Sequence, residues 1–375
     1  MIGLVHIAGA VLRIDLGAIV ANYHIIRKQA ADTEVAGVVK ANAYGLGAPE
    51  VAAALAQAGC RHFFVAQLSE AVSLRHALDA SGALNNATLY VLNGLQPGAE
   101  SVAAEIGVTP VLNSLDQVDR WSAEAAACGR ALPAALQVDS GMSRLGLPPA
   151  EVETLASAPE RLNGIDLRLI MSHLACADDA TAEANKAQTE AFEALASRFP
   201  GVPRSLDNSG GSFLPRDHFN IVRPGIALYG GAPQAGSPNP MHPVVTLEAR
   251  IVQVRDVPAG VGVGYGLSSV AGYARRIATI AVGYADGWPR HLSNCGSVFI
   301  GGHRAPIAGR VSMDSITIDV TEVPPALLYL GAPVELLGPH QTIDDVAADA
   351  GTISYEILTQ LGHRYAREYI PVAEG

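Results

Sequence analysis

Lys40 is the residue of this chain whose position most directly suggests chemistry. It follows an apolar run at 34–39 and precedes the segment Ala-Asn-Ala-Tyr-Gly-Leu-Gly. An ammonium group at the end of a buried strand loses solvation, which lowers its pKa and frees the amine for Schiff-base chemistry. Taken alone, the same lysine could simply cap a strand in water. Its function therefore depends on which residues the fold brings to it.

The chain around Lys40 alternates short β-branched runs with longer alanine-rich segments. Strands are predicted at 35–39, 63–66, 89–92, 108–112, 134–138, 167–171, 204–206 and 221–226. Helices are predicted between most of them, at 48–58, from Ser69 onward, at 114–127 and at 181–198. This alternation implies a parallel sheet with right-handed crossovers. The eight strands predicted between residues 35 and 226 favour a closed (β/α)8 barrel over an open doubly wound sheet.

In such a barrel the chemistry lies at the carboxyl ends of the strands. Polar residues at or just after predicted strand ends are Lys40, Arg144, His173, Asn208, Ser209 and Arg223. We therefore expect these side chains to converge on one mouth of the barrel.

A proline- and glycine-rich stretch at 230–243 reads as a domain linker. Beyond it, alternating runs at 246–255, 276–282 and 312–320 predict strands, with helices at 343–350 and 354–361. The predicted fold class is α/β, with a barrel domain at 1–240 followed by a mainly β domain at 241–375. The first residues of the chain are also candidates to join the β domain.

Composition excludes several classes of protein. Hydrophobic residues make up 49% of the chain and charged residues 16%, which argues against extensive disorder. The formal net charge of −11 disfavours nucleic acid as a partner. The four cysteines show no metal-ligand spacing, and no apolar stretch is long enough to cross a bilayer. We expect a soluble cytoplasmic protein without a metal site or a membrane partner.

The segment at 38–48 (VVKANAYGLGA) resembles the cofactor-lysine signature of alanine racemases, which are pyridoxal-phosphate enzymes with a barrel and a β domain. The resemblance extends in order through nearly the whole chain. Its further segments are VDSGMSRLG at 138–146, SHLA at 172–175, NS at 208–209, RPGI at 223–226, YG at 229–230, VGYG at 263–266, GYADG at 283–287, GRVSMD at 309–314 and TISYE at 352–356.

The resemblance implies racemisation of alanine with pyridoxal 5'-phosphate and two catalytic bases, Lys40 and Tyr265, supplying D-alanine for peptidoglycan. It implies a homodimer with shared active sites, in which Tyr265 and Met313 come from the partner subunit. The cofactor-binding residues that it implies are Lys40, Tyr44, Arg144, His173, Asn208, Ser209, Arg223, Gly225, Ile226 and Tyr355. The substrate-binding residues are Arg144, Tyr265, Tyr284, Met313 and Asp314.

The implied roles are chemically consistent. Racemisation removes the Cα proton from one face and returns a proton to the other, so bases on opposite faces suit it. Tyrosine is a poor base at neutral pH, and His173 is a plausible link between Tyr265 and Arg223 that favours its phenolate. Arg223 holds its proton firmly, so it would leave the cofactor ring neutral and disfavour transamination and decarboxylation.

The main departure from the family pattern is Gln137. Many members have a carbamate-bearing lysine there, which braces the arginine corresponding to Arg144. A neutral amide cannot supply that negative charge, so either Arg144 is held more weakly or a bound anion replaces the carbamate.

Other functions remain open at this stage. The runner-up is a racemase of broader specificity, acting on serine or larger amino acids. Decarboxylation or aldol cleavage of amino acids uses a similar domain plan, but Arg223 argues against it. A third class is a non-catalytic protein that binds or carries pyridoxal phosphate with a lone barrel. The β domain with Tyr265 and Met313 argues against it.

Overall fold

The computed structural model describes residues 7–78 and 81–372, and the chain divides into two compact units. The barrel unit comprises residues 20–228 and 232–241. The β unit comprises 7–19, 229–231 and the described residues from 242 onward. Each unit has its own set of buried apolar side chains.

The barrel unit is built on parallel strands that follow one another in chain order. The seven-stranded sheet runs β3 (Gly37–Val38), β4 (His62–Val65), β5 (Thr88–Val91), β6 (Thr109–Leu112), β7 (Leu132–Gln137), β8 (Ile165–Met171) and β9 (Arg204–Ser205). The two remaining strands, β2 (Glu34–Val35) and β10 (Ile221–Val222), pair in parallel. β10 is joined to its other neighbour where Asn220 donates to the Arg204 carbonyl at 2.9 Å. Because β2 and β3 are consecutive, these bonds close the ring, and the expected barrel fold is confirmed.

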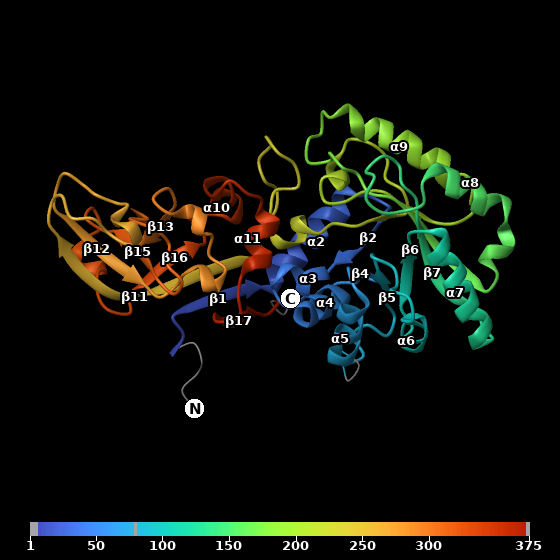
Figure 1. Ribbon diagram of the computed structural model, residues 1–375, viewed down its shortest axis with the longest axis horizontal. Coiled ribbons are helices and arrows are strands. Elements are labelled where there is room, and N and C mark those ends of the chain that lie inside the picture. The colour runs from blue at the N-terminus through green and yellow to red at the C-terminus, as the bar shows by residue number, and fades with distance from the viewer. Residues whose placement is uncertain (1–6, 79–80, 373–375) are drawn as a thin grey trace. The chain divides into compact units, whose positions relative to one another are not determined.

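Helices alternate with these strands, and Figure 1 shows α4 to α7 lying beside β4 to β7. They are α2 (Leu16–Gln29), α4 (Ala48–Gln57), α5 (Leu68–Leu78), α6 (Glu100–Glu105), α7 (Leu115–Cys128), α8 (Pro149–Ser157) and α9 (Glu183–Ala196). In α7, Val118, Trp121 and Ala125 are buried at helical spacing, which makes one face apolar. Ser114 caps its first turn by accepting from the Gln117 amide. None of the described helices is long and apolar enough to cross a membrane.

The β unit contains an eight-stranded sheet. Its main path is β14 (His303–Pro306), β13 (Ser297–Ile300), β16 (Pro333–Leu337), β11 (Val245–Val257), β1 (Ala10–Asp15) and β17 (Ala366–Ile370). From β11 it continues through β12 (Arg275–Ile280) to β15 (Ile316–Asp319). β1 pairs with β11 and β17, so the first described strand belongs to this unit. Two helices, α10 (Ile343–Ala350) and α11 (Ser354–Gln360), complete it.

Two predicted strands extend furthest beyond the observed ones. The strand predicted at 221–226 ends at Val222, because Pro224 has no N–H to donate and a short helical turn begins at Ile226. The strand predicted at 312–320 begins only at Ile316. The Ser312 and Met313 carbonyls instead accept from the amides of Tyr284 and Ala285.

Candidate active site

Lys40 begins α3 (Lys40–Tyr44), which has the opposite hand to the other helices of the barrel unit. Ala41, Asn42, Ala43 and Tyr44 all have positive φ, between 51° and 56°. Each non-glycine residue in this conformation costs roughly 1–2 kcal/mol. The turn must therefore be held in place by its surroundings.

Glu70 and Asn42 supply that support. One oxygen of the Glu70 carboxylate accepts from the Ala41 amide at 2.6 Å. The other accepts from the Ala66 amide at 2.7 Å, so the carboxylate ties the turn to the loop after β4. Asn42 Oδ1 accepts from the Ala48 amide at 2.9 Å and fixes the exit into α4. Sequence reasoning missed Glu70, although an acidic residue in the first turn of a helix was a signal that it binds backbone amides.

The surroundings of Lys40 favour its neutral form. Burial lowers its pKa below the ordinary lysine value, and the positive charges of Arg144 and Arg223 lower it further. The Glu70 carboxylate opposes this shift. Lys40 thus has the properties of a nucleophilic amine and of a proton acceptor.

Arg223 is the buried cation of the barrel mouth, with 4% of its surface exposed. Its guanidinium donates to the Ser172 carbonyl at 2.5 Å and to the Ser205 hydroxyl. Its Cζ atom lies 5.9 Å from the centre of the Phe64 ring. Burial lowers the pKa of Arg223 to about 10, against the opposing effect of Asp207. Arg223 is still charged at neutral pH.

His173 is neutral and lies against Arg223. Its Nδ1 atom is 3.5 Å from Arg223 Nη2. Burial lowers the pKa of His173 to about 3, assisted by the positive charges of Arg223, Arg144 and Lys40. Asn208 lies beside the same ring, with its Nδ2 atom 3.5 Å from Nε2, and also donates to the Leu174 carbonyl at 3.2 Å.

Ser209, Tyr44, Gly225 and Ile226 gather at the same mouth. Ser209 Oγ accepts from the amides of Gly225 at 2.9 Å and Ala227 at 3.3 Å. A Cβ atom on Gly225 would lie 2.2 Å from the Tyr44 hydroxyl, so only glycine admits this tyrosine. Two hydroxyls beside a glycine without a side chain suit a phosphate group, since hydroxyls donate to phosphate oxygens and the glycine leaves room for them.

Arg144 lies at the exposed edge of the mouth. The Gln137 side chain donates to the carbonyl of Leu145, the residue after Arg144, at 3.2 Å. Gln137 therefore holds the backbone of this loop. Asp139 fixes the rest of the loop, because one of its oxygens accepts from the amides of Gly141, Met142 and Ser143 at 2.9, 3.1 and 3.1 Å. Sequence reasoning missed this role, although Asp before Gly is typical of such turns.

In the β unit, Tyr265 lies in a short 3-10 turn and has 71% of its surface exposed. Positive φ angles at Gly264 (74°) and Gly266 (68°) set its backbone path. Gly309 packs against the preceding segment, since a Cβ there would lie 2.8 Å from the Val263 carbonyl. The Tyr265 turn therefore contacts the loop that leads to Met313.

Tyr284, Met313 and Asp314 share that region of the β unit. A Cβ on Gly283 would lie 2.3 Å from the Met313 carbonyl, so the two loops are in close contact. Asp314 accepts from Arg364 at 2.6 Å, and Arg364 also binds the buried Asp286 through two nitrogens. Tyr284 and Met313 are 41% and 52% exposed.

Tyr355 lies on α11 and is 41% exposed. The end of this helix contacts the Tyr284 turn, since a Cβ on Gly287 would lie 1.7 Å from the Gln360 carbonyl. The predicted site residues thus form two groups, one at the barrel mouth and one on the β unit. Among the described residues, no cluster of three or more histidine, cysteine or acidic side chains could hold a metal ion.

The fold and these groups define a class: a parallel barrel with a lysine and a buried arginine at its mouth, together with a β domain that presents tyrosines. The chain matches the alanine racemase N-terminal domain over residues 14–233 and the alanine racemase C-terminal domain over residues 244–369. It therefore belongs to the alanine racemase family.

Individual proteins of the same family are similar to this chain in sequence and in structure. The chain is 53% identical over 360 residues to a catabolic alanine racemase of Agrobacterium fabrum, covering 96% of this chain and 92% of that protein. It is similar to the alanine racemase of Bartonella henselae with covalently bound pyridoxal phosphate, at 45% identity and a TM-score of 0.91, covering 97% and 100% of the two chains. A biosynthetic alanine racemase from Pseudomonas aeruginosa is 36% identical with a TM-score of 0.89, over 97% and 100%.

Proposed function

We propose that this protein racemises L-alanine and D-alanine with pyridoxal 5'-phosphate. The observation that carries the proposal is the barrel mouth, where Lys40 with a lowered pKa lies in the field of the buried, charged Arg223. The Bartonella relative, which carries this cofactor covalently, supports the choice of cofactor. When bound, the cofactor withdraws the electron pair left at Cα after proton removal.

The residues of the barrel mouth fit this cofactor. Lys40 would attach it, and Arg223 would hold its ring nitrogen. Tyr44, Ser209, Gly225 and Ile226 surround its phosphate, supported by the absence of a Cβ atom where the Tyr44 hydroxyl meets Gly225. Tyr355 of the β unit completes the phosphate site in this proposal.

Arg223 also restricts the outcome of the reaction. A guanidinium does not readily protonate the ring nitrogen, so the negative charge at Cα is less delocalised into the ring. Return of a proton to Cα is then favoured over transamination. Arg223→Glu should raise the fraction of turnovers that end in a ketoacid, and an unchanged fraction would contradict this role.

Lys40 and Tyr265 are the two bases in this proposal, with Tyr265 supplied by a second copy of the chain. In this proposal the neutral His173 ring links Tyr265 to Arg223, whose positive charge favours the deprotonated form of Tyr265. His173→Ala should therefore raise the α-deuterium isotope effect on turnover of one alanine enantiomer more than of the other, whereas kcat/KM must fall equally in both directions because the two enantiomers have equal free energy. Equal changes of the two isotope effects would remove His173 from the proton path.

The shared site can be tested directly. Lys40→Ala homodimers should be inactive, and Tyr265→Phe homodimers should retain at most about a hundredth of the wild-type rate. Mixing them under conditions that exchange subunits should restore activity, because each heterodimer contains one site with both bases. Mixing that restores nothing, with subunit exchange shown by mass, would mean that both bases come from one copy. Lys40→Ala mixed with itself is the control.

Alanine is the substrate that the β-unit residues favour. Tyr265, Tyr284 and Met313 are bulky and lie on connected loops, which suits a small side chain. Arg144 and the Met313 amide are proposed to hold the substrate carboxylate, with Asp314 fixing the loop through Arg364. The alternative is a broader racemase that also accepts serine.

The physiological role is a separate question. The 53% identical relative is described as catabolic, and the 36% identical structure as biosynthetic. The catabolic relative favours a role of this protein in alanine breakdown over the supply of D-alanine for peptidoglycan. A deletion strain that loses growth on alanine as sole nitrogen source, yet needs no added D-alanine, would support the catabolic role. A requirement for D-alanine would support the peptidoglycan role.

Activity is tested by incubating the cofactor-loaded protein with L-alanine, L-serine and L-lysine and following loss of optical rotation. Alanine should racemise fastest, and Lys40→Ala is the matched control. Comparable rates with serine would favour the broader racemase, and no reaction with alanine would overturn the proposal.

A further inference from the structure

The connection from β9 to β10, residues 206–220, crosses between parallel strands without an α-helix. Its one regular element is the short 3-10 turn Gly211–Phe213. Its first half carries Ser209, which the proposed function places at the cofactor phosphate. A segment without a helical hydrogen-bond ladder needs other contacts to fix its conformation.

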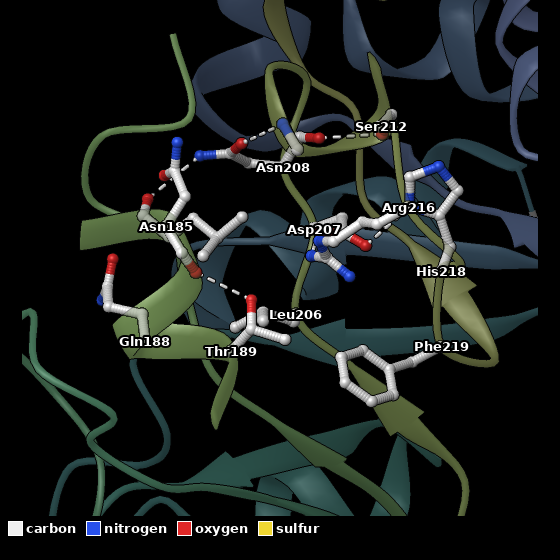
Figure 2. A network of polar contacts seen from close by, with 12 residues as sticks. Asn185, Gln188, Thr189, Leu206, Asp207, Asn208, Ser212, Arg216, His218 and Phe219 are labelled. Carbon is white, nitrogen blue, oxygen red and sulfur yellow. Dashed lines mark hydrogen bonds and ion pairs between the residues drawn. The ribbon is translucent and has the colours of Figure 1, made fainter. Parts of the chain in front are cut away.

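The Asp207 carboxylate supplies such contacts by joining the two halves of the connection. One oxygen accepts from Arg216 Nη2, and the other lies 2.9 Å from His218 Nδ1. Figure 2 shows Asp207 beside Arg216 and His218. The side chains of Asp207 and His218 are only 1% and 5% exposed, so water competes little for these bonds.

The second half of the connection is held to the barrel independently of Asp207. The Phe219 ring packs edge to face on Phe192 of α9, with ring centres 5.0 Å apart. The Phe219 carbonyl accepts from the Thr33 hydroxyl at 2.9 Å. Asn220 Oδ1 accepts from the Arg204 amide at 2.7 Å. Asp207 is therefore bound to a fixed support.

The first half is folded tightly onto the Asp207 carboxylate. A Cβ atom on Gly211 would lie 2.7 Å from Asp207 Oδ1, so the turn closes against this oxygen. The Gly211 amide donates to Asn208 Oδ1 at 3.0 Å. Asn208 and Ser209 directly follow Asp207 in the chain, so the position of the carboxylate sets the path of the backbone through both.

The position of Ser209 decides how its hydroxyl meets a ligand. Ser209 Oγ accepts from the amides of Gly225 at 2.9 Å and Ala227 at 3.3 Å. A hydroxyl oxygen has two lone pairs and one proton. With both lone pairs engaged, the hydroxyl can meet a phosphate oxygen only as a donor, and it does so only while Ser209 stays against these amides.

We propose that Asp207 is a positioning residue for the cofactor phosphate: its carboxylate, bound by Arg216 and His218, holds the β9–β10 connection so that the Ser209 hydroxyl points its proton at the phosphate. This inference rests on the proposed function, which it deepens at the phosphate end of the cofactor.

A positioning role differs from a merely structural one in which part of the cofactor it affects. Asp207→Asn keeps the side-chain volume but removes the charge, so Arg216 and His218 are held less firmly and Ser209 is less often in place. Lys40 is supported by Glu70 and Asn42, which lie outside the connection. Attachment of an aldehyde to Lys40 should therefore persist, while recognition of the phosphate weakens.

The test compares two aldehydes, pyridoxal 5'-phosphate and pyridoxal, which lacks the phosphate. Each is titrated into cofactor-free protein, and the visible absorbance of the Lys40 adduct is followed. Asp207→Asn should weaken binding of pyridoxal 5'-phosphate by at least about tenfold, the value of one hydrogen bond to a charged group. It should weaken binding of pyridoxal by less than about twofold, the usual scatter between independent sites.

Asp217→Asn is the matched control. Asp217 lies on the same connection but is exposed, so the affinity for both aldehydes should stay at the wild-type value. Arg216→Gln is the second variant, because it removes the other half of the ion pair and should give the same selective loss. The double variant should lose no more affinity than the weaker single variant, since both substitutions break one interaction.

Equal losses for the two aldehydes in Asp207→Asn, or no loss for pyridoxal 5'-phosphate, would overturn the proposal. If Asp207→Asn does not fold, Arg216→Gln decides alone, and an unchanged affinity for pyridoxal 5'-phosphate refutes the role. Additive losses in the double variant would also refute it. If wild-type protein bound neither aldehyde at Lys40, the proposed function itself would fail, and this result is distinct from the loss of selectivity between them.

Discussion

The barrel mouth and the tyrosine-bearing face of the β unit hold their candidate residues in opposite ways. At the mouth, Arg223 is 4% exposed and its guanidinium donates to several fixed acceptors. On the β unit, Tyr265 is 71% exposed, and glycine turns set its backbone path. Substitutions at the mouth should therefore change stability and chemistry together, whereas substitutions at the exposed tyrosines should change chemistry alone.

The largest effect should come from Lys40→Ala. The variant loses both the attachment of the cofactor and one base, so the racemisation rate should fall by more than about 10⁴-fold. The visible absorbance of the protein-bound cofactor should disappear as well. Steady-state rates and absorbance spectra of the loaded protein measure both effects. A variant that retained covalent cofactor would show that another lysine attaches it.

Tyr265→Phe should lower the rate by about 10²–10⁴-fold, the usual contribution of a positioned acid or base. Because the change removes only a hydroxyl from a side chain that is exposed within its own chain, the melting temperature should stay within the error of wild type. Differential scanning calorimetry of the cofactor-free protein measures the second point. A clear fall in melting temperature would contradict the expectation that substitutions at the exposed tyrosines change chemistry without changing stability.

His173 should make the barrel unit sensitive to acid. Its pKa falls from the ordinary value of 6.5 to about 3 on folding, chiefly through burial. Below pH 6.5 the unfolded chain takes up a proton that the folded chain refuses until about pH 3, so stability is lost as pH falls. The loss is about 1.4 kcal/mol per pH unit in this window.

Urea unfolding of the cofactor-free protein at pH 7 and pH 5 measures this slope. His173→Gln should flatten it, whereas His303→Gln, an exposed histidine of the β unit, should leave it unchanged. A wild-type slope that survives in His173→Gln would assign the acid sensitivity to another group.

The smallest effect should come from Asp314→Asn. Its ion pair with Arg364 is exposed, with side chains 62% and 51% accessible, so the loss of stability should be below about 1 kcal/mol. Asp286→Asn removes the buried partner of the same arginine and should cost more, since it also loses the Gly283 amide. Equal losses of unfolding free energy in Asp314→Asn and Asp286→Asn would show that burial does not govern stability in this region.

The sequence predicted much of the fold because its repeats are local. Strand positions follow β-branched runs, and α10 coincides with the prediction because Thr342 and Gly351 mark its two ends. The end of β10 was misplaced because the hydrophobic run continues past Pro224, which breaks the ladder.

The roles assigned to the site residues remain predictions, and their supports were harder to see in advance. Ordered motifs identified Lys40 and Arg223. Glu70 and Asp139 carry local signals, an acidic residue in the first turn of a helix and an aspartate before a glycine turn, but the amides that they bind are defined only once the loops are folded. Asp207 binds Arg216 and His218, which no motif marked.

The left-handed turn that follows Lys40 has a consequence for the chemical synthesis of this protein. At residues 41 and 43 the backbone has φ angles of 51° and 53°, which D-alanine prefers and L-alanine avoids. A semisynthetic chain carrying D-alanine at the exposed position 41 should fold normally and gain roughly 1 kcal/mol, because the mirror-image residue removes the steric clash. A member of the alanine racemase family thus contains, beside its key lysine, backbone sites shaped for the D enantiomer of alanine.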